Sequence, residues 1–404
     1  MPGDKSISHR ALMLGALADG TSTIGGLSTG ADVIGTASIM SSLGATVTLG
    51  ERVSVIGPPE GLTPSCDPLD CGNSGTTARL LLGLLAGVPG VHHLDGDESL
   101  RRRPMNRVLA PLHLMGVALS TPEVNATFPL TIESSGRSLA LSYDVPVVSA
   151  QVKSAVLFAG LVADGPVTVR ERVTTRTNTE DMFADAGLRV ERSAWRVGQS
   201  VTLWPGRPTA RHWEVPGDPS QAAFFAVLAA VSGSRIALPS LYQGPERTGF
   251  LRVLERMGAR VDWLPDEVVV QGADLEGTEI FGSEIPSVDE VPALAVACAA
   301  ARGRSVFRDV GELRFKESDR FAATIALVQA LGAVAWADED DLIIDGLTSA
   351  RAFEDFAFGS ALDHRMVMAA AVAGVAGRGV TIETPLAVAS SYPHFFADLE
   401  SVLS

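Results

Sequence analysis

Leu43-Gly44-Ala45-Thr46-Val47 is the first of five similar segments, in which a glycine ends an expected helix and a β-like run follows. Glycine tolerates the left-handed conformation that closes many helices, so each segment is expected to be a helix end that leads into a strand. The glycines recur at intervals of 72, 71, 71 and 74 residues, at Gly44, Gly116, Gly187, Gly258 and Gly332. This regular recurrence predicts a fold built from repeated units.

A second series of six apolar stretches runs alongside, and each stretch follows a small or polar motif. The stretches are apolar on nearly every face, which indicates helices buried inside a core rather than lying on a surface. They cover residues 10–18, 76–86, 151–163, 220–231, 290–301 and 364–376. Each repeat therefore contains a buried helix, an amphipathic helix and strand segments. Six such repeats predict an α/β (α+β) protein of two domains with three repeats each.

The pattern Pro-Gly-Asp-x-Ser occurs at residues 2–6 and again at 216–220, which are 214 residues apart. Proline and glycine are typical of a chain crossing, and Ser or Asp then suits the cap of the helix that follows. We expect one domain over residues 5–216 and the other over residues 217–404 plus 1–4, with hinges near Gly3-Asp4 and Gly217-Asp218. The cleft between the domains would receive six helix N-termini, which favour anions.

The chain is acidic, with 32 basic residues, 47 acidic residues and a formal net charge of −15, which argues against nucleic acid as a partner. An acidic protein still binds a small anion when its cations gather in one cleft. The chain has three lysines, Lys5, Lys153 and Lys316, and each lies in a polar motif before an expected helix. Lysine rather than arginine at these places suggests a use for a compact ammonium group.

The apolar stretches are shorter than the 18 or so residues that a membrane helix needs, so no membrane partner is expected. Three cysteines, Cys66, Cys71 and Cys298, have the spacing of neither a disulfide framework nor a metal site. We expect a cytoplasmic monomer that uses no metal and no cofactor.

The most charged segment is Arg314-Phe315-Lys316-Glu317-Ser318-Asp319-Arg320, which lies between a β-like run at 305–307 and an expected helix at 321–331. Ser318 or Asp319 suits the N-cap of that helix, which would place Lys316 and Glu317 at a helix entrance. Two cations that bind an anion, together with a carboxylate that moves a proton, would make a reaction site. The alternative is a solvated charge cluster on the surface.

Other polar motifs stand at the heads of expected helices. Gly72-Asn73-Ser74-Gly75-Thr76-Thr77-Ala78-Arg79 is a small-residue loop whose amides suit an anion, although it lacks the Gly-Lys-Ser/Thr of a P-loop. Arg101-Arg102-Arg103-Pro104-Met105 is expected to begin an amphipathic helix, with Pro104 in the first turn. Its guanidinium groups suit carboxylates or phosphates, and a solvated surface run is the alternative. The remaining motifs cover residues 4–10, 148–153, 175–180, 289–290 and 363–365.

Taken in this order, the motifs resemble those of the 5-enolpyruvylshikimate-3-phosphate synthase family (3-phosphoshikimate 1-carboxyvinyltransferases), over essentially the whole chain. The motifs are Pro-Gly-Asp-Lys-Ser-Ile-Ser-His-Arg, Gly-Asn-Ser-Gly-Thr, Arg-Arg-Pro-Met, Ser-Ala-Gln-Val-Lys-Ser, Arg-Phe-Lys-Glu-Ser-Asp-Arg and Asp-His-Arg. The resemblance implies two domains, each of three βαβαββ units around buried parallel helices, with the active site in the interdomain cleft. It also implies the family's step of the shikimate pathway of aromatic amino acid biosynthesis. In that step the enolpyruvyl group of phosphoenolpyruvate passes to the 5-hydroxyl of shikimate 3-phosphate through a tetrahedral intermediate, and phosphate is released.

The resemblance also implies roles for individual residues. Lys5 would contact both substrates, Asp289 would be the base at the 5-hydroxyl, and Glu317 would donate a proton to C3 of phosphoenolpyruvate. The residues implied to bind shikimate 3-phosphate are Lys5, Ser6, Arg10, Ser149, Ala150, Gln151, Arg176, Asp289 and Lys316. Those implied to bind phosphoenolpyruvate are Lys5, Asn73, Gly75, Thr76, Arg103, Gln151, Arg320, His364 and Arg365.

Departures from the family pattern fall at or near these binding positions. Ser390 stands where many members have a lysine near phosphoenolpyruvate, and Ala150 stands where some have a second serine. Gly75 lacks the methyl group that accompanies tolerance of glyphosate, so the resemblance implies inhibition by glyphosate in competition with phosphoenolpyruvate. The last repeat is expected to be incomplete, because a sixth glycine would fall near residue 404.

Two alternatives remain beside this reading. One is a catalytically silent relative that keeps the anion cleft, although Lys5, Asp289 and Glu317 are all present. The other is an enolpyruvyl transferase that acts on another acceptor, such as UDP-N-acetylglucosamine. That family usually has asparagine after the first lysine and a cysteine on a loop just before the Arg-Pro motif. This chain has Ser6 after Lys5 and no cysteine between Cys71 and Arg103.

Overall fold

The computed structural model describes residues 1–119, 126–359 and 362–403. The chain forms two compact units, each of which is described separately. The N-terminal unit is Lys5–Val215, and the C-terminal unit is Met1–Asp4 with Pro216–Ser404. In the part of the chain that is described, no helix has both the length and the apolar character to cross a membrane.

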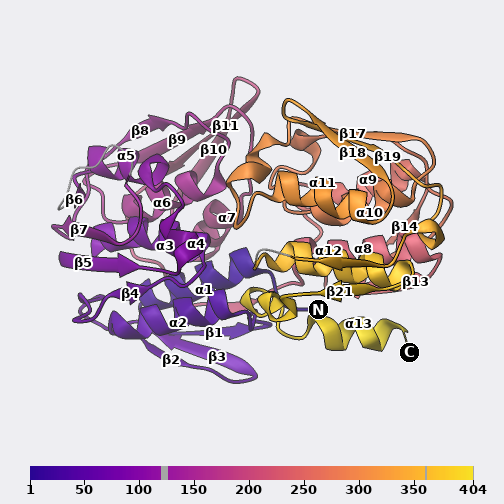
Figure 1. Cartoon of the computed structure of the whole chain (residues 1–404). Coiled ribbons are helices and arrows are strands. Elements are labelled where there is room, and N and C mark those ends of the chain that lie inside the picture. Colours follow the sequence, from indigo (N-terminus) through magenta and orange to yellow (C-terminus); the bar gives the residue numbers. More distant parts are fainter. Residues whose placement is uncertain (120–125, 360–361, 404) are drawn as a thin grey trace. The chain divides into compact units, whose positions relative to one another are not determined.

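The N-terminal unit is built around three helices that are buried along most of their length and pack on one another (Figure 1). They are α1 (Lys5–Leu17), α3 (Gly75–Leu84) and α6 (Ala150–Gly160). Three further helices carry fewer buried residues, namely α2 (Ala31–Ser42), α5 (Asn106–Leu114) and α7 (Asn178–Asp185). The buried helices coincide with the apolar stretches of the sequence, because a helix that is apolar on every face is stabilised most when it is fully buried.

Three four-stranded sheets complete this unit, and they share one order. In each sheet the first two strands are parallel and the later pairs are antiparallel. The strands, in sheet order, are β12 (His212–Glu214), β1 (Thr21–Gly25), β3 (Arg52–Ile56) and β2 (Thr46–Thr48); β4 (Leu69–Asp70), β5 (Gly90–Asp95), β7 (Leu130–Ser134) and β6 (Ala118–Leu119); and β8 (Ser142–Asp144), β9 (Val167–Glu171), β11 (Gly198–Leu203) and β10 (Val190–Trp195).

The C-terminal unit repeats this plan with α8 (Pro219–Ser232), α10 (Val291–Ala300) and α12 (His364–Ala376), which pack side by side (Figure 1). All residues of α10 are buried. The other helices are α9 (Gly249–Met257), α11 (Arg320–Ala330) and α13 (Phe395–Leu403). Its strands are β13 (Arg235–Pro239), β15 (Glu267–Gln271) and β14 (Arg260–Trp263); β16 (Glu279–Phe281), β17 (Arg304–Arg308), β19 (Asp341–Asp345) and β18 (Val334–Asp338); and β20 (Phe356–Phe358) with β21 (Val380–Ile382).

The five glycines that define the sequence repeat do end helices. Their φ angles are positive, at 101° for Gly44, 95° for Gly116, 83° for Gly187, 114° for Gly258 and 90° for Gly332. Each follows α2, α5, α7, α9 or α11 within two residues, and β2, β6, β10, β14 or β18 begins shortly afterwards. The prediction of helix ends that lead into strands is therefore confirmed. In the described part of the last repeat, β20 and β21 form a two-stranded sheet, which is smaller than the other sheets.

The arginine-rich segment differs from its prediction. The short helix α4 (Glu98–Arg101) ends at the first arginine, and α5 begins after Met105. Pro104 therefore lies between two helices and not in the first turn of one. Asp97 caps the earlier helix by accepting a hydrogen bond from Leu100 N at 2.8 Å. Pro104 disfavours helical geometry at the residue before it, so the two helices are separate.

Candidate active site

The residues implied by the sequence fall into two clusters, one in each unit. The N-terminal cluster lies around the first turns of α1, α3 and α6. The C-terminal cluster lies around the first turns of α10, α11 and α12. A helix begins with free backbone N–H groups and the positive end of its dipole, so both clusters have a backbone that favours anions.

In the N-terminal cluster, Ser6 connects two guanidinium groups. Arg10 Nη1 donates to the Ser6 carbonyl at 2.7 Å, and Arg176 Nη1 donates to the Ser6 hydroxyl at 3.2 Å. Arg10 also donates to Thr179 Oγ1 at 2.6 Å and to Ser154 Oγ at 2.7 Å, which fixes its orientation. The sequence did not indicate the last two hydroxyls as partners, because they come from separate helices. Lys5, the first residue of α1, forms an ion pair with Asp32.

The head of α3 is connected to the head of α6 through Gln151. Arg79 Nη1 donates to Gln151 Oε1 at 2.5 Å, and Gln151 Nε2 donates to Thr76 Oγ1 at 3.1 Å. Ser74 caps α3 by accepting from Thr77 N at 3.1 Å. Ser149 caps α6 in the same way, and Ala150 is the first residue of that helix. These contacts place several of the implied residues at two adjacent helix heads.

Among the three consecutive arginines, Arg103 is buried and belongs to this cluster. Its Nη2 donates to Ser99 Oγ at 3.0 Å and also to Asn73 Oδ1, so it joins the loop before α3. Arg101 and Arg102 are exposed and form ion pairs with Asp95 and Glu98 on the surface. The surface alternative therefore holds for Arg101 and Arg102, whereas Arg103 is buried at the loop before α3.

Lys153 does not lie with the other implied cations. Its ammonium is fully buried, 2.8 Å from Glu171 Oε2 and 2.8 Å from Glu180 Oε1. Gln199 Nε2 donates to both carboxylates, and Thr175 Oγ1 donates to Glu171. The compact ammonium of Lys153 thus serves two internal carboxylates.

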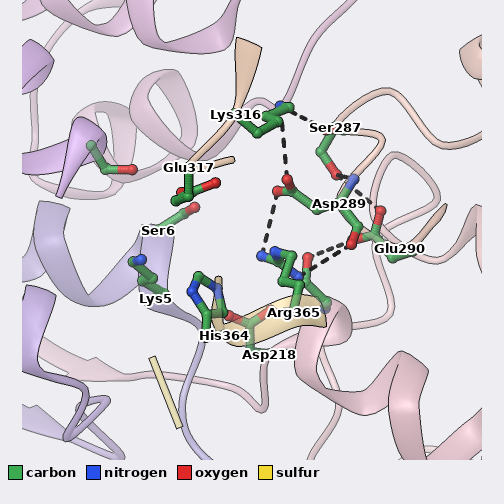
Figure 2. Close-up of polar contacts among 12 residues, drawn as sticks. Lys5, Ser6, Asp218, Ser287, Asp289, Glu290, Lys316, Glu317, His364 and Arg365 are labelled. Atoms are coloured by element: carbon green, nitrogen blue, oxygen red, sulfur yellow. Dashed lines mark hydrogen bonds and ion pairs between the residues drawn. The ribbon is translucent and has the colours of Figure 1, made fainter. Parts of the chain in front are cut away.

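The C-terminal cluster is organised around Asp289, just before α10. Three cations approach its carboxylate: Arg320 Nη1 at 3.1 Å, Arg365 Nη2 at 3.5 Å and Lys316 Nζ at 3.7 Å. Figure 2 shows Lys316 and Arg365 beside Asp289. Lys316 Nζ also donates to the Ser287 carbonyl at 3.0 Å. These contacts with three cations set the position of the Asp289 carboxylate.

Arg320 connects Asp289 to a second carboxylate. Its side chain is 1% exposed, and its Nη2 lies 2.5 Å from Glu317 Oε2. Its Nε donates to Asp363 Oδ2 at 2.8 Å. Burial alone would lower the pKa of this guanidinium, but Asp363, Glu317 and Asp289 together raise it. Arg320 therefore stays charged and holds Asp289 and Glu317 on one rigid group.

Asp363 is a positioning residue that the sequence identified only as a helix cap. It does cap α12, accepting from Arg365 N at 3.0 Å, and it also accepts from Ser318 Oγ at 2.9 Å. Burial alone would raise the pKa of Asp363, but the Arg320 guanidinium lowers it below the usual range. The predicted cap of α11 is also present, since Asp319 accepts from Ala322 N at 3.0 Å.

His364 and Ser390 meet beside the head of α12. The Ser390 hydroxyl lies 3.1 Å from His364 Nδ1 and donates to the Ala387 carbonyl at 3.0 Å. The hydroxyl has one proton, which the carbonyl receives, so the imidazole Nδ1–H is the donor of the other hydrogen bond. The serine that departs from the family pattern thus orients the histidine. Within the residues that the structure describes, no group of three or more His, Cys, Asp or Glu side chains is arranged to hold a metal.

The chain is similar to known proteins over its whole length. Residues 1–399 match the family model described as EPSP synthase (3-phosphoshikimate 1-carboxyvinyltransferase). A 3-phosphoshikimate 1-carboxyvinyltransferase of Anaeromyxobacter sp. (strain Fw109-5) is 43% identical, and the aligned region covers 100% of this chain and 95% of that relative. One from Acidiphilium cryptum is also 43% identical, with 98% and 92% of the two chains covered.

Solved structures give the same result. The EPSP synthase of Acinetobacter baumannii superposes with a TM-score of 0.85 at 34% identity, covering 99% of this chain and 94% of that one. The enolpyruvyl transferase NikO of Streptomyces tendae shares the fold, with a TM-score of 0.77 at 18% identity and coverage of 99% and 93%. The family resemblance and the two-domain fold inferred from the sequence are confirmed. This chain belongs to the EPSP synthase (3-phosphoshikimate 1-carboxyvinyltransferase) family.

Proposed function

We propose that the two clusters divide the binding and the chemistry of the family's reaction between them. The chain is an enolpyruvyl transferase of aromatic amino acid biosynthesis, and it transfers the enolpyruvyl group of phosphoenolpyruvate to shikimate 3-phosphate with release of phosphate. The roles of individual residues are the part that we propose.

The N-terminal cluster would bind the anionic groups of the substrates. Lys5, Arg10, Arg79, Arg103 and Arg176 bring five cationic groups to the heads of three helices. Bidentate guanidinium groups and helix N-termini both suit phosphate and carboxylate oxygens. Ser6, Ser149, Ala150, Gln151, Arg10 and Arg176, with Lys316 of the C-terminal cluster, would hold shikimate 3-phosphate. Asn73, Gly75, Thr76 and Arg103, with Arg320, His364 and Arg365 of the C-terminal cluster, would hold phosphoenolpyruvate, and Lys5 would contact both substrates.

The C-terminal cluster would move the protons. In the addition step Asp289 takes the proton of the 5-hydroxyl, the freed oxygen bonds to C2 of phosphoenolpyruvate, and Glu317 gives a proton to C3. In the elimination step the Glu317 carboxylate takes a proton back from that methyl group, the C2–C3 double bond re-forms, and the C2–O bond to phosphate breaks. The observation that carries this proposal is that Arg320 contacts Asp289 at 3.1 Å and Glu317 at 2.5 Å. The two carboxylates thus contact one fixed guanidinium at separate positions. The reaction needs two such groups, because one proton is removed and another is delivered.

We propose two further properties, inhibition by glyphosate and a monomeric state in the cytoplasm. We expect glyphosate to compete with phosphoenolpyruvate, because a Cβ at Gly75 would lie 3.1 Å from Arg103 Nη1 and the glycine leaves that space open. We also expect a cytoplasmic monomer.

The test compares Asp289→Asn and Glu317→Gln with Glu312→Gln, which changes an exposed carboxylate five residues before Glu317. Loss of a positioned general acid or base should lower kcat by about 100- to 10,000-fold, while affinity for shikimate 3-phosphate by calorimetry changes little. Glu312→Gln should behave like the wild type. Full turnover in Asp289→Asn or in Glu317→Gln would remove that residue from the proposed chemistry.

A further inference from the structure

We infer that Arg247, Ser220 and Glu290 form a buried positioning network that holds Asp289 in place for proton transfer. The network begins at the two Pro-Gly-Asp segments and ends at the turn that carries Asp289. The inference rests on the role proposed above for Asp289, and the experiment below separates the two.

Arg247 binds the aspartates of both Pro-Gly-Asp segments. Its side chain is 2% exposed, with Nη1 2.5 Å from Asp4 Oδ2 and Nη2 3.1 Å from Asp218 Oδ1. The backbones of the two segments also pair, since Asp4 N donates to the Pro216 carbonyl at 2.7 Å. A single guanidinium thus fastens the two places at which the chain passes between the units.

The contact continues through Ser220 to Glu290. Arg247 Nη2 donates to Ser220 Oγ at 3.2 Å, and the Ser220 hydroxyl donates to Glu290 Oε1. The other oxygen, Glu290 Oε2, accepts from Ser287 Oγ at 2.9 Å. A guanidinium can only donate and a carboxylate can only accept, so the Ser220 hydroxyl accepts from Arg247 and donates to Glu290. Glu290 is 2% exposed, which makes the loss of either bond costly.

The network ends at a strained turn. Val288, between Ser287 and Asp289, has a φ of 50°. This left-handed conformation is a genuine outlier for a β-branched residue, and it persists only where the surroundings enforce it. Two contacts enforce it at Ser287, whose hydroxyl donates to Glu290 and whose carbonyl accepts from Lys316 Nζ at 3.0 Å (Figure 2).

The position of Asp289 therefore depends on a backbone that would relax if the network were broken. Relaxation at Val288 rotates the peptide before Asp289 and moves its carboxylate away from Lys316, Arg320 and Arg365. Proton transfer is sensitive to such a shift, since a displacement of about 1 Å can cost about 100-fold in rate. Binding of shikimate 3-phosphate depends on many other contacts and should be affected less.

The experiment uses Ser220→Ala, which removes the central hydroxyl without touching Asp289 or its turn. We expect kcat to fall by about 10- to 100-fold while the KM values change by less than about threefold. Ser220→Thr keeps a hydroxyl and should restore most of kcat. If Ser220→Ala does not fold, Ser287→Ala breaks the same chain of hydrogen bonds at a less buried position, and the same changes in kcat and KM are expected.

A rescue variant separates positioning from general damage. Val288→Gly lets the turn keep its positive φ without strain. Adding it to Ser220→Ala should therefore reverse at least about half of the decrease in kcat that Ser220→Ala causes. Val288→Ala removes similar volume but keeps the strain, so it should not rescue. Equal kcat in Ser220→Ala and the wild type, or equal effects of Val288→Gly and Val288→Ala in that background, would overturn the inference. Asp289→Asn is measured alongside: full activity there would instead refute the role of Asp289, whereas loss there with an unaffected Ser220→Ala refutes the network alone.

Discussion

Lys153→Met tests whether the Lys153 ammonium stabilises the fold and does not bind a substrate. In the wild type the Lys153 ammonium lies 2.8 Å from each of two carboxylates, and the three side chains are at most 3% exposed. Methionine fills similar space but leaves Glu171 and Glu180 with two buried negative charges and no cation. Removing one partner of a buried ion pair costs about 3–5 kcal/mol. For a unit of the size of Lys5–Val215, that loss lowers the melting temperature by about 6–20 °C.

The same substitution at Lys5 is the matched control. Lys5 forms an ion pair with Asp32 and is proposed to bind both substrates. Lys5→Met should therefore weaken substrate binding, and it should lower the melting temperature less than Lys153→Met does. Scanning calorimetry gives the melting temperatures, and titration calorimetry well below them gives the affinity for shikimate 3-phosphate. Lys153→Met should keep that affinity within about fivefold. A native melting temperature together with lost affinity in Lys153→Met would refute the reasoning, because it would mean that the ammonium serves the substrate.

Three further predictions concern the two clusters. Glu317→Gln should slow the incorporation of solvent deuterium into the product by about 100-fold or more, measured by mass spectrometry in D₂O; unchanged incorporation would exclude it as the proton donor to C3. Gly75→Ala would place a methyl group 3.1 Å from Arg103 Nη1 and 3.2 Å from Arg79 Nη1, so it should raise both the KM for phosphoenolpyruvate and the Ki of glyphosate; unchanged values for both would contradict this. The pKa of Asp363 is lowered in the folded protein, so its contribution to stability is present above pH of about 4 and is lost as the pH falls further. Asp363→Asn should therefore be less stable than the wild type at pH 7, with a difference that shrinks below pH of about 4 in chemical denaturation; a constant difference would count against it.

Local signals in the sequence predicted the elements and their ends. Gly44 and Gly258 end helices because the left-handed conformation is a property of the residue itself. Asp319 caps α11 because a carboxylate accepts from the backbone three residues on. The buried helices follow from composition, since residues 291–300 include no charged side chain that would need water.

Contacts between distant residues could not be predicted in the same way. The sequence shows three arginines in a row, but it is the break before Pro104 that turns Arg103 inward and leaves Arg101 outside. Lys153 meets Glu171 and Glu180 only after α6, β9 and α7 have packed together. Arg247 lies in no motif, and its role depends on two aspartates that are 214 residues apart in the chain. Such pairings are set by tertiary packing and not by local pattern.

This chain transfers an enolpyruvyl group to shikimate 3-phosphate. The most direct measurement is release of inorganic phosphate by the purified protein with phosphoenolpyruvate and shikimate 3-phosphate, with each substrate omitted in turn and with UDP-N-acetylglucosamine as the alternative acceptor. We expect release only when both substrates are present, together with a product whose mass equals that of shikimate 3-phosphate plus the enolpyruvyl group. Release with UDP-N-acetylglucosamine instead, or binding of shikimate 3-phosphate without any release, would contradict the account.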